Sequence, residues 1–316
     1  MTTLFRKSVR ALPFAAPSSL AASPAVPHRL IAALRPMTSS TTYYPPLVRL
    51  SKDLSAQTYA VILSSPPVNA LTPTLLRQLQ AHLLHLHADQ QSYLNHGLIL
   101  TSTFPNIMSA GLDWDCLIHN EETESFQDFE IRFRNYLNLF QDCCKLLLTI
   151  SMPTIAVVRG ACPAGGTVLS LCCDERIGVS SPSFLMGLNE VAIGMNLPSW
   201  IHHLAYQTLG QNSKTRRFLQ QGYLVRSAEE ALELGYIDKL VYSNEDIAEN
   251  VGSELRHYLS QPWTARTLTK KTQNQHVVDS MGPAAIDDLW MTVGSAEFQE
   301  KVKLFKQKIR NRAKDA

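Results

Sequence analysis

The sequence predicts an α/β fold followed by a C-terminal helical region. Short apolar segments that suit buried strands alternate with helical patterns over the first half of the chain. From Leu197 onward the pattern is mainly helical. Hydrophobic residues make up 45% of the 316 residues and charged residues 18%, which is typical of a globular chain with a sizeable core.

The predicted strands are short and rich in β-branched residues. They cover residues 59–63, 97–100, 153–158, 176–179 and 183–186. The predicted helices have apolar side chains at three- to four-residue spacing. They cover residues 72–86, 126–148, 167–172, 200–209, 213–220, 228–234, 245–259 and 297–312. Irregular chain is expected over 103–113, and a tight glycine-rich turn over 160–166.

Charge and cysteine usage exclude several classes of protein. The formal net charge of +2, from 29 basic and 27 acidic residues, gives no support for nucleic-acid binding. No stretch approaches 18 uninterrupted apolar residues, so we expect no transmembrane segment. The six cysteines include no C-x-x-C pair, and we expect them to be reduced, mostly buried and in an intracellular compartment.

The first 52 residues differ in composition from the rest of the chain. They contain seven basic residues and no acidic residue, and they are rich in Ala, Ser, Thr and Pro. Such a segment resembles an organellar transit peptide, with a disordered basic tail as the alternative. We expect cleavage near Arg35–Tyr43.

Three segments that each follow a predicted strand have the residue types of a ligand site. They are Ser109–Asp113 (SAGLD), Gly160–Gly166 (GACPAGG) and Gly187–Glu190 (GLNE). Glycines let the backbone approach a ligand closely, and the N–H groups at a helix start lack intrahelical acceptors. The second segment lacks the G-K-[ST] ending of a phosphate-binding loop. A glycine turn before a helix therefore favours a developing anion, although alone it could be purely structural.

Together and in this order, these segments resemble the enoyl-CoA hydratase/isomerase (crotonase) superfamily, most closely its mitochondrial Δ3,Δ2-enoyl-CoA isomerases. CCDERI at 172–177 and PPVNAL at 66–71 are similar to further signatures of that branch. The resemblance runs from about residue 44 to 310. It implies a crotonase fold, a spiral of ββα units with a C-terminal helical trimerisation region. The chain would then divide into a transit peptide at 1–43, a spiral core at 44–250 and a helical region at 251–316.

The resemblance also implies site residues. The backbone N–H groups of Leu112 and Gly165 would form an oxyanion hole, and Glu190 would be the catalytic acid/base. Asn189 would position the substrate or the carboxylate. The substrate-binding residues implied by the family are Ala110, Gly111, Leu112, Asp113, Trp114, Gly165 and Asn189. No metal site is expected: His82, His85 and His87 recur at helical spacing but suit a solvent-exposed face, and Asp174 suits a structural role.

One carboxylate suits a double-bond shift better than a hydration. A single base can remove a proton at C2 and return it at C4, and apolar neighbours such as Leu188, Val191, Ile193 and Leu197 would raise its pKa. Hydratases of the family carry a second glutamate, at the position occupied here by Val168. The expected activity is therefore isomerisation of 3-enoyl-CoA to trans-2-enoyl-CoA in β-oxidation. The alternatives are hydration, thioester hydrolysis, or a catalytically silent member that binds CoA or RNA.

The expected partners follow from the same resemblance. The substrate is an acyl-CoA, so coenzyme A enters with the substrate and no separate cofactor is expected. Residues 66–70 and 110–113 would line its path, and lysines of the last helix would approach its phosphates or simply be solvated. Homotrimers are implied, as is a location in the mitochondrial matrix. Trp200 and the apolar stripe Phe126–Phe140 are expected to be core or the wall of an acyl pocket.

Overall fold

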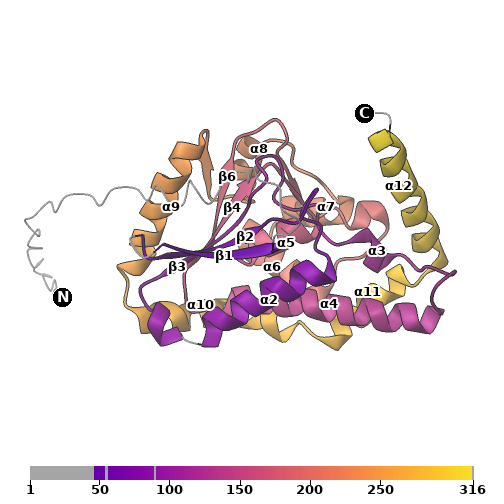
Figure 1. The fold of residues 1–316 in the computed structure, drawn as a ribbon, viewed down its shortest axis with the longest axis horizontal. Coiled ribbons are helices and arrows are strands. Elements are labelled where there is room, and N and C mark those ends of the chain that lie inside the picture. Colours follow the sequence, from indigo (N-terminus) through magenta and orange to yellow (C-terminus); the bar gives the residue numbers. More distant parts are fainter. Residues whose placement is uncertain (1–45, 54–55, 89, 315–316) are drawn as a thin grey trace, which may run out of the picture.

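The computed structural model describes residues 46–53, 56–88 and 90–314 (Figure 1). The segment expected to be a transit peptide lies outside these residues. Within them, no helix is both long enough and apolar enough to cross a membrane. All six cysteines are buried and free, as the sequence predicted.

A six-stranded sheet forms the centre of the structure. Its order is β1-β2-β3-β4-β6-β8, and every pair is parallel except the antiparallel β1 and β2. The strands are β1 (Val48–Asp53), β2 (Thr58–Leu63), β3 (Gly97–Ser102), β4 (Thr154–Arg159), β6 (Glu175–Val179) and β8 (Lys239–Val241). The predictions of β2, β3, β4 and β6 are confirmed, whereas β1 and β8 were not predicted.

The helices follow the predicted pattern, with three α-helices that were not predicted. The larger ones are α2 (Pro73–Ala88), α4 (Phe126–Thr149), α6 (Ser199–Leu209), α9 (Asn244–Leu259), α10 (Trp263–Asp279), α11 (Pro283–Val293) and α12 (Ala296–Lys314). Shorter ones are α3 (Trp114–Leu117), α5 (Gly165–Leu171), α7 (Ser213–Gln221) and α8 (Ala228–Glu233), with 3₁₀ turns η1 (Gln90–Tyr93) and η2 (Val191–Ile193). Among the long helices, α10 and α11 were not predicted.

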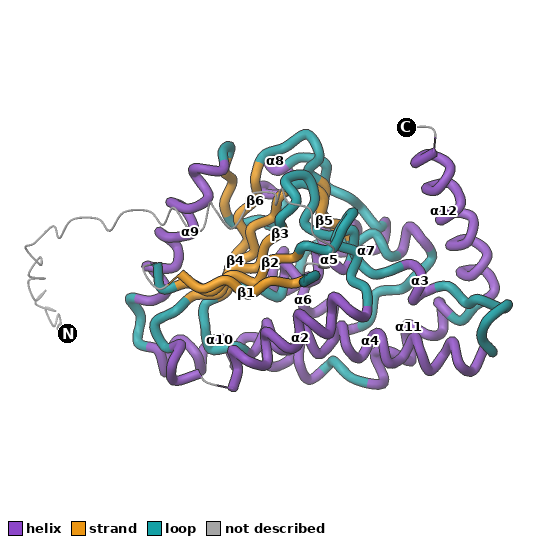
Figure 2. Tube along the Cα trace, in the orientation of Figure 1, coloured by secondary structure: helices purple, strands orange, loops and turns teal. Residues whose placement is uncertain are grey.

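Helices cover both faces of the sheet (Figure 2). Alternate side chains of β2 separate into two clusters, because successive residues of a strand point to opposite faces. Val61 and Leu63 pack into the main core with α2 and α4, whereas Ala60 and Ile62 pack toward Val251 on α9. Burial on both faces explains why β2, β3 and β4 are continuous apolar runs.

One predicted feature needs correction. The segment 160–166 is more than a turn, because it contains a short strand, β5 (Ala161–Pro163), which pairs in parallel with β7 (Leu185–Gly187). The region after residue 197 is mainly helical, as predicted, and also contributes β8, which pairs with β6 at the edge of the main sheet. Strands of three residues are too short to show a periodicity of their own.

The three histidines of α2 are not all exposed. Only His85 faces solvent. His82 and His87 are half-buried, and their Nε2 atoms lie 3.3 Å from the carbonyl of Val48 and 2.9 Å from that of Leu146. These contacts tie α2 to β1 and α4. Across the described residues, no group of three metal-ligating side chains converges.

Candidate active site

The small β5–β7 sheet joins the glycine turn to the GLNE segment. The Ala164 N–H donates to the Gly187 carbonyl at 2.8 Å. In return, the Gly187 N–H donates to Thr167 Oγ1 at 2.9 Å, and that hydroxyl donates to the Cys162 carbonyl. Two segments that are more than 20 residues apart in the sequence are therefore fixed against each other.

The SAGLD loop packs against the same turn. The Met108 N–H donates to the Ala161 carbonyl at 2.7 Å, which brings the loop alongside β5. A Cβ added to Gly165 would lie only 3.2 Å from the Leu112 nitrogen, and one added to Gly111 would lie 3.2 Å from the Gly165 nitrogen. Gly111 also has a φ of +86°, a conformation that other residues rarely adopt. Glycine therefore suits both positions, because another side chain would be strained at 111 and a Cβ would press on the facing backbone at 165.

Two backbone N–H groups are left without acceptors at this junction. Gly165 is the first residue of α5, so its N–H has no intrahelical partner. Neither Gly165 nor Leu112 donates in any turn, loop or cap hydrogen bond of the described residues. Ala164, the residue before α5, has a φ of +51°, a strained conformation that turns the chain sharply into the helix. The pair forms a ready site for a developing negative charge.

Glu190 lines a small cavity together with Leu112 and Gly165. Its side chain is 3% exposed, and its Oε2 has no hydrogen-bond partner within the described part of the chain. Burial raises the pKa of this carboxyl to about 7, partly opposed by a hydrogen bond from its own backbone N–H. Of its sequence neighbours, Leu188 and Leu197 are buried, but Val191 is 39% exposed. The apolar surroundings therefore come mainly from other elements, and not from the adjacent residues alone.

The cavity around Glu190 is mostly apolar. It is lined by Leu112, Leu137, Phe140, Gly165, Val168, Glu190, Met195, Asn196, Pro198, Trp200, Ile201 and Leu289. Phe140 and Trp200 thus belong to its wall, whereas Phe129 and Phe133 are fully buried in the core. Val168 also lies in this wall and is fully buried. The arrangement offers one carboxylate, two N–H donors and a small apolar cavity of about 20 Å³.

Of the predicted substrate-binding residues, only Leu112 and Gly165 line this cavity, and the others do not. Ala110 and Asn189 are half-buried, and the Oδ1 of Asn189 has no hydrogen-bond partner within the described chain. The Asp113 side chain caps α3 by accepting from the Asp115 N–H at 3.2 Å. The Trp114 ring packs against Phe305 of α12, with 5.4 Å between centroids. Substrate contacts by these side chains stay predictions.

Sequence reasoning missed part of the cavity wall. Met195, Pro198 and Ile201 carry no motif, and Leu289 lies on a helix that was not predicted, whereas Leu137 belongs to the stripe expected to be core or acyl-pocket wall. Apolar residues at helical spacing were the only available signal, and that signal does not separate a cavity wall from a core.

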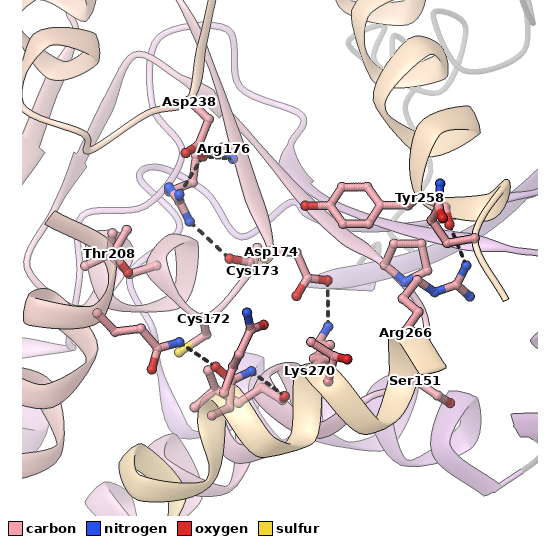
Figure 3. Close-up of a pocket in the computed structure, with 18 of the residues that line it drawn as sticks. Ser151, Cys172, Cys173, Asp174, Arg176, Thr208, Asp238, Tyr258, Arg266 and Lys270 are labelled. Atoms are coloured by element: carbon pink, nitrogen blue, oxygen red, sulfur yellow. Dashed lines mark hydrogen bonds and ion pairs between the residues drawn. The ribbon is translucent and has the colours of Figure 1, made fainter. Parts of the chain in front are cut away.

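A larger cavity of about 1170 Å³ lies elsewhere, and its lining includes Ser151, Asp174 and Lys270 (Figure 3). Its walls carry a salt bridge between Lys270 and Asp174 at 2.7 Å and another between Arg176 and Asp238 at 2.5 Å. Asp174 also accepts from the Thr154 N–H at 2.8 Å. These carboxylates are already paired, and Asp174 has the structural role that the sequence predicted. The Glu190 cavity is therefore the candidate active site.

Comparison with known proteins gives a consistent result. The family described as enoyl-CoA hydratase/isomerase matches residues 55–310. The chain is 32% identical over 223 residues to human "Enoyl-CoA delta isomerase 1, mitochondrial", covering 71% of this chain and 69% of the relative. It is 29% identical over 253 residues to the mouse protein of the same name, covering 79% of this chain and 83% of the relative.

Solved structures share the fold. The structure of human mitochondrial Δ3-Δ2-enoyl-CoA isomerase aligns with a TM-score of 0.74 at 26% identity, covering 84% of this chain and 99% of that one. An enoyl-CoA hydratase from Bacillus halodurans aligns with a TM-score of 0.69 at 20% identity, covering 82% and 99%. The predicted crotonase fold is confirmed, and the chain belongs to the enoyl-CoA hydratase/isomerase family.

Proposed function

We propose that this protein is a Δ3,Δ2-enoyl-CoA isomerase that converts 3-enoyl-CoA to trans-2-enoyl-CoA. The observation that carries the proposal is the composition of the cavity. A single buried carboxylate, Glu190, shares it with two unpaired N–H groups, and an apolar residue occupies the position of a second glutamate. The isomerase names of the mouse and human relatives favour the same reaction.

The reaction is a 1,3-proton shift. The carboxylate of Glu190 takes a proton from C2, and the electrons of that bond move into the thioester to give an enolate. The N–H groups of Leu112 and Gly165 donate to the enolate oxygen as its charge develops. The carboxylic acid of Glu190 then returns the proton at C4, while the double bond forms between C2 and C3. No proton is gained or lost overall.

A pKa near 7 suits both halves of this cycle. A carboxylate with the ordinary pKa would be a weak base toward the C2 proton. Its conjugate acid would return the proton to C4 readily, but the first proton transfer would seldom occur. Burial raises the pKa of Glu190 to about 7. The carboxylate is then a stronger base for removing the C2 proton, and the carboxylic acid is still able to return it to C4.

Hydration is the competing reaction of the family. It requires a water molecule held and deprotonated beside C3, for which the hydratases use two glutamates. Val168 is fully buried in the cavity wall and cannot accept a hydrogen bond from water. This position therefore favours isomerisation over hydration.

Further parts of the proposal rest on the family resemblance. The substrate would belong to the β-oxidation of unsaturated fatty acids in the mitochondrial matrix, in keeping with the mitochondrial names of the relatives. Residues 66–70 and 110–113 would line the path of coenzyme A, and the active protein would be a homotrimer. Light scattering of the purified protein tests the assembly, and a reporter fused to residues 1–45 tests the location.

The activity itself has a direct test. Purified protein is incubated with trans-3-hexenoyl-CoA, and the ultraviolet absorbance of the conjugated 2-enoyl thioester is followed. A rise in absorbance that depends on the protein supports the proposal. Absence of product with a folded preparation that binds CoA esters contradicts it.

A further inference from the structure

The position of the Leu112 N–H depends on hydrogen bonds that lie outside the reacting groups. Leu112 lies between Gly111, which is bonded directly to Leu71, and Asp113, which is linked to Leu71 through the Tyr136 hydroxyl. The Leu71 N–H donates to the Gly111 carbonyl at 2.9 Å. A parallel bridge therefore pairs Leu71 with Leu112.

A tyrosine of α4 completes this pairing. The Tyr136 hydroxyl donates to the Leu71 carbonyl at 2.7 Å and accepts from the Asp113 N–H at 2.9 Å. Tyr136 is 3% exposed, so both bonds form away from water. One side chain thus joins the two backbone segments directly beside Leu112.

A second set of bonds holds the other end of the loop. Ser109 Oγ donates to the Asn69 carbonyl at 2.7 Å and accepts from the Gly111 N–H at 3.1 Å. Asn69 Nδ2 donates to the Met108 carbonyl at 3.0 Å, and both Ser109 and Asn69 are fully buried. The loop is fixed on both sides of Leu112 by hydroxyl groups that each donate one hydrogen bond and accept another, and neither Tyr136 nor Ser109 lines the cavity.

We propose that Tyr136 and Ser109 are positioning residues that hold the Leu112 N–H in line with the thioester oxygen. The inference rests on the proposed function, because the proposed function places the Leu112 N–H in the oxyanion hole. Leu71 also contacts the residue that carries the other donor. Its Cδ1 would lie 3.2 Å from a Cβ added to Gly165. Loosening the Tyr136 bonds would therefore misdirect a donor without removing any group that contacts substrate.

The central variant is Tyr136→Phe, which keeps the ring and deletes the hydroxyl. We expect kcat for 3-hexenoyl-CoA to fall about 10- to 100-fold, approaching the loss of one oxyanion donor. KM should change less than about threefold, because the acyl and CoA contacts are intact. Tyr59→Phe is the matched control. Tyr59 is also buried, but it lies at the amino end of β2 and is not part of the hydrogen bonds around Leu112. Its kcat should stay at the wild-type value.

A spectroscopic readout separates positioning from general loosening. A conjugated 2,4-dienoyl-CoA is bound to the protein, and the red shift of its absorbance reports polarisation of the thioester carbonyl. The shift should be present in wild type and Tyr59→Phe and reduced in Tyr136→Phe. Ser109→Ala removes the bond at the other end of the loop and should reduce both kcat and the shift. It serves as the test if Tyr136→Phe does not fold.

The outcomes distinguish the two proposals. If wild type shows no isomerisation, the proposed function fails, while the red shift still tests the positioning of Leu112. If wild type isomerises and a folded Tyr136→Phe keeps its kcat, Tyr136 is not a positioning residue. If kcat falls but the red shift is unchanged, the loss arises elsewhere and the inference is overturned.

Discussion

Replacing Glu190 with glutamine should make the protein more stable, by an amount that depends on pH. The carboxyl titrates near 4.5 in an unfolded chain and near 7 in the folded protein. The difference of about 2.5 pKa units corresponds to about 3 kcal/mol of unfolding free energy. The folded wild-type protein holds the Glu190 proton more tightly than the unfolded chain does. Protonation therefore stabilises the folded state fully below pH 4.5, and this stabilisation is lost as the pH rises through 7. The glutamine variant has no such loss.

Urea unfolding of both proteins at pH 4.5 and pH 8 measures this effect. The stability of Glu190→Gln relative to wild type should increase by about 3 kcal/mol between the two conditions. The same raised pKa should appear in catalysis, with kcat/KM rising to a plateau above a midpoint near pH 7, because the free enzyme needs the carboxylate. A midpoint near 4.5, together with a stability difference that is equal at both pH values, would refute the buried-carboxyl reasoning.

Three further predictions concern single residues. Gly165→Pro deletes one oxyanion donor and places a Cβ 3.2 Å from the facing Leu112 nitrogen, so kcat should fall at least about 100-fold in a variant that circular dichroism shows to be folded. Ala164→Gly relieves the φ of +51° and should raise the unfolding free energy by about 1 kcal/mol with kcat unchanged, whereas a loss of stability would argue against strain there. Lys270→Ala removes the ion-pair partner of the half-buried Asp174 carboxylate, which keeps only its hydrogen bonds from Thr154, and should lower the unfolding free energy by about 2–3 kcal/mol in urea, whereas Lys303→Ala, at an exposed ion pair, should change it little.

Much of the fold could be predicted because its elements are long or strongly patterned. The continuous apolar runs of β2 and β4 and the phenylalanine spacing of α4 reflect burial that is visible in sequence order. By contrast, β8 has three residues, and α10 buries only a narrow stripe, including the polar Lys270 and Asn274. Neither gives a periodic apolar signal.

Two kinds of signal pointed to the candidate site: the family resemblance for Glu190 and Val168, and backbone requirements for the glycines. Gly111 and Gly165 are needed because a Cβ would contact the facing backbone, and this need is readable in the sequence. Tyr136 gave no signal, because it continues the apolar stripe of α4 and its role depends on which carbonyl lies opposite its hydroxyl. That juxtaposition exists only in three dimensions.

The most direct test of the one-carboxylate mechanism is a paired assay on wild type and Glu190→Gln. Isomerisation of 3-hexenoyl-CoA and hydration of crotonyl-CoA are measured side by side, with CoA-ester binding measured separately. Wild type should isomerise strongly and hydrate very weakly, since Val168 cannot hold the water. Glu190→Gln should bind the ester but lose isomerisation, because an amide cannot take the C2 proton. Faster hydration than isomerisation by wild type, or a Glu190→Gln variant that keeps most of its isomerase rate, would contradict the mechanism.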